Sequence, residues 1–125
     1  MNIIRTENAP AAVGPYSQAV EAGALIFSSG QLPLDPATGT LVPGGIAEQT
    51  AQVLHNLASV LEAAGSGLDK VVKTTCYLKN LQDFPAFNEA YARFFSAGSA
   101  PARSCLEAAA LPKNALVEID VIALK

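Results

Sequence analysis

The chain has 125 residues, a formal net charge of −3 and eight basic residues scattered along its length. The length suits one domain, and 50% of the residues are hydrophobic, which excludes a disordered chain. No basic run or stripe can neutralise phosphates, so we expect no nucleic-acid partner. No stretch approaches the ~20 apolar residues of a membrane span, and residues 1–16 lack the pattern of a signal peptide.

Two further features of the composition are informative. Cys76 and Cys105 are too few for a disulfide framework or a metal cluster, and we interpret them as reduced thiols of a cytoplasmic protein. Only 15% of the residues are charged, a low fraction for a small protein with a large relative surface. This indicates that part of the surface is buried against other subunits.

Turn-forming residues and short apolar runs alternate in the first part of the chain. Residues 5–16 contain two prolines and a glycine and are expected to be irregular. Residues 17–21 and 24–29 are predicted to be short strands, joined by a tight turn at Gly23. Residues 31–45, with three prolines and three glycines, are predicted to form short extended pieces and a turn.

The remaining residues contain two helical patterns and three strand patterns. Apolar residues recur at helical spacing over 46–64, and an aromatic stripe predicts a second helix over 84–95. β-Branched or alternating residues predict strands at 71–78, 102–108 and 116–124. Two helices and about six strands indicate one α+β domain over 1–125, with the helices packed on one face of a mixed six-stranded sheet.

The last predicted strand has two different faces. Val117, Ile119 and the alternate residues after them form an apolar face that is expected to meet the helices. The opposite face carries Glu118 and Asp120 among apolar residues, which is too apolar for open water and too acidic for a core. A sheet whose back packs against neighbouring subunits would reconcile these properties, provided that the carboxylates find partners.

Arg103 and Glu118 are the main candidates for chemistry. Alternation places Arg103, Cys105 and Glu107 on one face of their strand. If the two C-terminal strands were neighbours, Arg103 and Glu118 would either form an ordinary ion pair or line a pocket together. In a pocket, the planar guanidinium of Arg103 would suit a substrate carboxylate, and Glu118 would handle a water or a proton.

Other polar residues allow two interpretations. His55 is interpreted as a solvated helix residue, and as the only histidine it leaves no Ser-His-Asp triad. Cys105 is interpreted as a thiol that lines a pocket rather than as a nucleophile, because it has no obvious histidine partner. Ser29 and Gly30 either present a hydroxyl and backbone N–H groups to an anion or form a simple bend.

Five long segments are informative in combination: ENAPAAVGPYSQAV, FSSGQLPLDPATG, QTAQVLHNLASVLEAAG, VVKTTCYLKNLQDFPAFNEAYARFF and PARSCLEAAALPKNALVEIDVIAL. In this order they resemble the RidA (YjgF) family of reactive-intermediate imine deaminases, over nearly the whole chain. The resemblance implies a chorismate-mutase-like α+β fold, assembled as a homotrimer with sites in the clefts between subunits. It also implies hydrolysis of 2-enamine and 2-imine acids, such as 2-aminoacrylate, to 2-keto acids and ammonia, without a metal or organic cofactor.

The resemblance further implies a role for each matching residue. Arg103 in PARSC would bind the substrate carboxylate, and Glu118 in the last strand would position the attacking water. The residues that would line the pocket are Tyr16, Ser29, Gly30, Asn88 and Cys105.

One difference from the family leaves the substrate open, and two other functions are alternatives to imine deamination. The loop 96–100 is shorter than in some relatives, which leaves the preferred imine open. A module that binds 2-keto acids without turning them over, with a regulatory or chaperone-like role, is the alternative to an enzyme. A nuclease is disfavoured by the acidic pI near 5.0 and by the single histidine.

Overall fold

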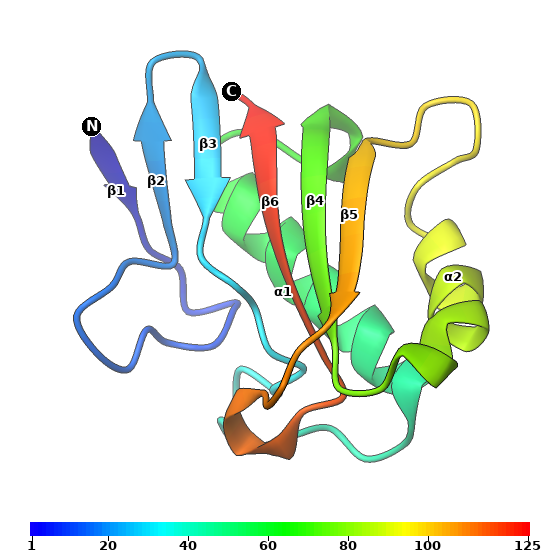
Figure 1. The fold of residues 1–125 in the computed structure, drawn as a ribbon. Coiled ribbons are helices and arrows are strands. Elements are labelled where there is room, and N and C mark those ends of the chain that lie inside the picture. The colour runs from blue at the N-terminus through cyan, green and yellow to red at the C-terminus, as the bar shows by residue number, and fades with distance from the viewer.

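A mixed sheet of six strands forms the centre of the protein in a computed structural model that describes residues 1–125 (Figure 1). The order of the strands across the sheet is β1-β2-β3-β6-β4-β5. Only β4 and β5 pair in parallel, and all other neighbours are antiparallel. The strands are β1 (Asn2–Ile4), β2 (Ala19–Ala22), β3 (Leu25–Ser28), β4 (Val71–Leu78), β5 (Ala102–Glu107) and β6 (Val117–Leu124).

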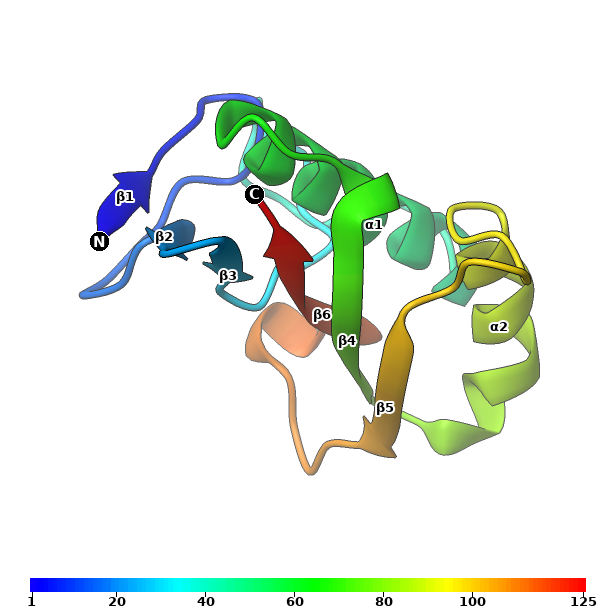
Figure 2. The ribbon, with the colours of Figure 1, turned by 90° about the horizontal axis from the view of Figure 1, so that it is seen from above.

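Two helices, α1 (Ile46–Ala63) and α2 (Phe84–Ala92), lie on the same side of this sheet (Figure 2). The start of α1 is fixed by Glu48, whose Oε1 accepts the backbone N–H of Gly45 at 2.8 Å. The chain leaves α1 through Gly65, which has a φ of 78° and suits a glycine at that position. Neither helix is long and apolar enough to cross a membrane.

The hydrophobic core lies between the sheet and the helices. Alternate residues of β6 point into it, and Val117, Ile119, Val121 and Ala123 are each at most 1% exposed, as the alternation of the sequence predicts. The helices supply the other half of this core, including Val53, Leu54, Leu57, Val60, Leu61 and Phe87, all 0% exposed.

The other face of the sheet carries no helix. Phe27, Leu106 and Leu124 remain 38%, 43% and 48% exposed there, and Glu118 and Asp120 of β6 share this face. The face thus combines exposed apolar side chains with two carboxyl groups, next to Lys73, Thr75 and Tyr77 of β4. We call it the open face of the sheet.

The predicted fold class is confirmed, with differences at the element ends. Strand β1 was not expected, because its three residues are too few to show an alternating pattern. The aromatic stripe predicts a helix to residue 95, but α2 ends at Ala92. The backbone N–H groups of Phe94 and Phe95 still bond to the Tyr91 carbonyl, and Phe95 is buried, so the stripe continues through a turn.

Packing on this core is expected to dominate stability. Leu57→Ala should lower the free energy of unfolding by about 2–5 kcal/mol, because Leu57 is 0% exposed and its loss leaves a cavity. The matched control is Leu81→Ala, since Leu81 is 45% exposed and its loss should change stability by less than about 0.5 kcal/mol. Urea unfolding of both variants measures the difference, and equal effects would contradict this core.

Candidate functional site

Four of the predicted site residues line one cavity of about 580 Å³: Tyr16, Ser29, Gly30 and Glu118. They come from three parts of the chain: the irregular segment before β2, the residues just after β3 and the start of β6. Lys113 is the one basic residue among the lining side chains. We call this space the Glu118 cavity.

Close packing between Gly30 and Glu118 shapes this cavity. A Cβ atom added at Gly30 would lie 2.8 Å from Cδ of Glu118, closer than real Cβ contacts. The backbone N–H of Gln31 also bonds to the Ile119 carbonyl at 2.8 Å, which fixes this segment against β6. The carboxyl group of Glu118 therefore occupies the space that a side chain at position 30 would take, and any such side chain would displace this carboxyl group.

The carboxyl group of Glu118 has an altered acidity. Burial raises its pKa, and the neighbouring carboxyl of Asp120 raises it further. Burial also raises the pKa of Asp120, although Lys73 and hydrogen bonds from Tyr77 and Thr75 oppose this shift. A carboxyl group whose pKa is shifted toward neutrality suits proton transfer.

A buried glutamine holds the segment that carries Tyr16. Gln18 is 3% exposed, and its Nε2 donates to the carbonyls of Thr6 at 3.0 Å and Pro10 at 2.8 Å, while its Oε1 accepts the Thr6 N–H at 2.8 Å. Next to it, the Ser29 hydroxyl donates to the Ser17 carbonyl. The Ser29 hydroxyl hydrogen is thus bonded within the protein, and the hydroxyl oxygen can still accept a hydrogen bond from a ligand.

The remaining predicted site residues lie at β5 and α2. The Arg103 guanidinium donates to Oδ1 of Asn88 at 2.8 Å. Its Cζ lies 4.9, 5.3 and 5.8 Å from the ring centres of Tyr91, Phe84 and Phe87, within the range of cation–π contacts. Arg103 forms no ion pair and is exposed, so its orientation is fixed while most of its N–H donors are available to a ligand.

The two thiols lie side by side on the helix-facing side of the sheet. Cys105 pairs in register with Cys76 across β4 and β5, and it packs against the hydrophobic core. Burial raises the pKa of Cys105 and raises that of Cys76 to about 12. Both are therefore thiols rather than thiolates, which argues against Cys105 as a nucleophile.

Arg103 and Glu118 do not meet within one chain. Strand β4 lies between β5 and β6, so the two strands are not neighbours. Arg103 pairs with Thr74 of β4 and Glu118 with Tyr77, and this odd separation places them on opposite faces of the sheet. The ordinary Arg–Glu ion pair is therefore wrong for this chain, and so is a shared pocket within it.

His55 belongs neither to the Glu118 cavity nor to the residues around Arg103. It is exposed on α1, with its ring against the edge of Phe94 at 5.1 Å between ring centres, in agreement with a solvated helix residue. No three side chains of His, Cys, Asp or Glu gather in a way that could hold a metal ion.

The sequence did not single out Gln18 or Lys113. Gln18 looks like any polar residue of a short strand, and only its burial shows that it holds the segment before it. Lys113 and Asn114 adopt positive φ values of 56° and 60°, and Lys79 Nζ donates to Oδ1 of Asn114 at 2.6 Å. The Pro-Lys-Asn triplet was a usable turn signal, since asparagine tolerates this conformation.

Substitution of Gly30 tests the packing of Glu118. Gly30→Ala should displace the carboxyl group of Glu118, because the new methyl group takes its place and the end of this side chain is free to move. The matched control is Gly98→Ala, which has open space around it and should leave Glu118 in place. NMR chemical shifts of the Glu118 carboxyl carbon compare the two variants, and an unchanged shift in Gly30→Ala would contradict the close contact.

Comparison with known proteins identifies the family. A family model described as endoribonuclease L-PSP matches residues 6–125. The chain is 52% identical over 123 residues to a RutC family protein of Pyrococcus horikoshii, covering 98% of this chain and 97% of the relative. It is 50% identical over 123 residues to a mouse protein named 2-iminobutanoate/2-iminopropanoate deaminase, covering 98% and 90%.

A solved structure gives the same result. Escherichia coli TdcF with bound serine superimposes with a TM-score of 0.93 at 39% identity, over 100% of this chain and 99% of that chain. The fold, the family model and the relatives agree over nearly all residues. The chain therefore belongs to the RidA (YjgF) family, whose sequence model carries the description endoribonuclease L-PSP.

Proposed function

We propose that this protein hydrolyses reactive 2-imino acids, and their 2-enamine tautomers such as 2-aminoacrylate, to 2-keto acids and ammonia. The observation that carries the proposal is that each chain holds two separate groups of residues, which we call half-sites. Arg103 is an oriented, unpaired cation at one place, and Glu118 is a carboxyl group of raised pKa in a cavity at another. We further propose that a homotrimer joins these half-sites in clefts between subunits, in the cytoplasm.

Related proteins support the reaction class. The mouse relative that is 50% identical bears the name of an imine deaminase, and TdcF holds a small amino acid. The proposed residues Tyr16, Ser29, Gly30, Asn88, Arg103, Cys105 and Glu118 are the positions that match the family pattern.

Arg103 would bind the substrate carboxylate. A guanidinium group offers two parallel N–H donors to a carboxylate, and such charge-assisted bonds are about twice as strong as neutral ones. Asn88 and the three aromatic rings hold the Arg103 side chain before a ligand arrives, so little conformational freedom would be lost on binding.

Glu118 would handle the proton and the water. As a carboxylate it accepts a proton from a water molecule, whose oxygen attacks the C=N carbon and forms a carbinolamine. The nitrogen takes up this proton and then the hydroxyl proton of the carbinolamine. The C=O bond forms as the C–N bond breaks, so one imine and one water give one 2-keto acid and one ammonia. Orientation and one acid–base group, worth ~10²–10⁴-fold, suffice for a reaction that is already fast in water.

Two observations support a cleft between subunits. Arg103 and Glu118 lie on opposite faces of one sheet, so one ligand can reach both only if they come from different copies. The open face exposes Phe27, Leu106 and Leu124, which a neighbouring subunit would cover. In a closed ring of three copies, the same contact between neighbouring subunits occurs three times, and no contact surface stays exposed.

Single substitutions test the two roles. A pyridoxal-phosphate dehydratase supplies 2-aminoacrylate from serine, and the formation of the keto acid is followed. Arg103→Ala should lower kcat/KM about 100-fold or more, and Glu118→Gln about 10²–10⁴-fold. Because the carboxylate form of Glu118 acts as the base and its pKa is raised, the wild-type rate should fall with decreasing pH already above 4.5, the ordinary glutamate value.

The control for this experiment is His55→Ala, since His55 is exposed on α1 and should not affect the rate. Full activity of a folded Arg103→Ala variant would overturn the proposed role of Arg103. Binding of 2-keto acids by the wild type without any rate enhancement would instead indicate a binding or regulatory module.

Mixed assemblies test the cleft between subunits. Inactive Arg103→Ala and Glu118→Gln proteins are unfolded together, refolded and assayed. About one quarter of the clefts in random trimers should combine an intact Arg103 with an intact Glu118, so activity should return to about a quarter of the wild-type value. Separately refolded variants mixed afterwards are the control. No recovery in co-refolded trimers would contradict a site shared between subunits.

A further inference from the structure

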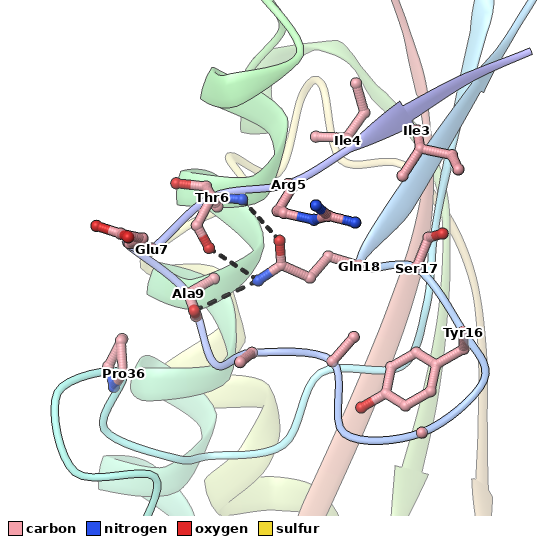
Figure 3. A pocket seen from close by; sticks show the side chains of 13 residues that line it. Ile3, Ile4, Arg5, Thr6, Glu7, Ala9, Tyr16, Ser17, Gln18 and Pro36 are labelled. Atoms are coloured by element: carbon pink, nitrogen blue, oxygen red, sulfur yellow. Dashed lines mark hydrogen bonds between the residues drawn. The ribbon is translucent and has the colours of Figure 1, made fainter.

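A second cavity of about 500 Å³ lies beside β1 and the irregular segment that follows it (Figure 3). It is distinct from the Glu118 cavity, but both are lined by Ala11 and Tyr16, so this segment is a shared wall. None of the roles described above uses the second cavity. We call it the Arg5 cavity.

Arg5 is the one basic residue among the side chains that line this cavity. It has no ion pair and no side-chain hydrogen bond: the one ion pair of the chain joins Lys125 to Glu21. In Figure 3 its guanidinium extends from the end of β1 into the space beside Gln18 and Ser17. Its N–H donors are thus available to a ligand, as those of Arg103 largely are.

The wall around Arg5 combines apolar and polar residues and is fixed in place. Buried Gln18 bonds to Thr6 and Ala9, as Figure 3 shows, and also to the Pro10 carbonyl. These bonds span the segment, so the cavity does not depend on a freely moving loop. The apolar lining residues are Ile3, Ile4, Ala9, Ala11, Ala12 and Pro36.

We propose that the Arg5 cavity is a second binding site, for a small monocarboxylic acid with a short apolar side chain. A single guanidinium matches one carboxylate, and the exposed side chain of Ile3 would contact the aliphatic part. A phosphate dianion fits less well, because Glu7 also lines the cavity and no second cation is present. Within the proposed function, the 2-keto acid product has this chemistry.

The site itself does not depend on the proposed reaction, and an experiment with the three arginines of the chain separates the two. Wild-type protein with labelled isoleucine methyl groups is titrated with 2-oxobutanoate, 2-aminobutanoate, butylamine and inorganic phosphate, and NMR shifts are followed. Ile3 and Ile4 report on the Arg5 cavity, and Ile26, 0% exposed in the core, is the internal reference. The same titrations are repeated with Arg5→Met, Arg103→Met and Arg93→Met.

A carboxylate should shift the Ile3 and Ile4 signals at millimolar concentration, whereas butylamine and phosphate should not. Arg5→Met should weaken this binding about tenfold or more, because the charge-assisted bonds are lost. Arg93→Met, at an exposed arginine just after α2, and Arg103→Met should leave it unchanged. Whether the keto acid or the amino acid gives the larger shift identifies which of the two the site prefers.

Two results would overturn the second site. One is the absence of a carboxylate-dependent shift at Ile3 and Ile4 in the wild type. The other is an undiminished shift in Arg5→Met, whose fold is expected to be intact because Arg5 is exposed and has no side-chain partner. Failure of the deaminase assay would leave these signals unaffected, so the two proposals fail separately.

Discussion

The alternation of β6 is the constraint on which the rest of the structure depends. This strand lies between β3 and β4, and Val117, Ile119, Val121 and Ala123 must face the helices to complete the core. Strict alternation then forces Glu118 and Asp120 onto the open face, where burial raises the pKa of both. A shift of one residue would place two carboxyl groups in the core, so the core fixes the position of Glu118.

The same geometry divides the proposed chemistry between two places. Arg103 is on the helix-facing side because it pairs with buried Thr74, and there Asn88 and the aromatic residues of α2 orient it. Glu118 lies on the other side of the sheet, in a cavity closed by Gly30 and the segment before β2. In the proposed function, each copy thus offers Arg103 to a carboxylate and, on the other face, Glu118 to a proton. One ligand would reach both residues only where two copies meet.

Local patterns predicted most of the fold, and long-range contacts account for what they missed. The helical spacing of 46–64 and the alternation of β6 express burial directly, so both elements were found nearly to the residue. The sequence does not show that β4 separates β5 from β6, because strand order depends on packing between distant segments. Gln18 and Lys113 were missed for the same reason: their surroundings come from other parts of the chain.

The contact between Gly30 and Glu118 also has a consequence for related sequences. The two positions share one volume, so a side chain at position 30 would displace the carboxyl group of a glutamate at position 118 from the place it has here. A relative with a larger residue at position 30 should therefore carry a shorter residue at 118 or hold its carboxyl group elsewhere. The presence of glycine at this single position thus becomes a marker, readable from sequence alone, of whether a family member keeps its carboxyl group in the cavity.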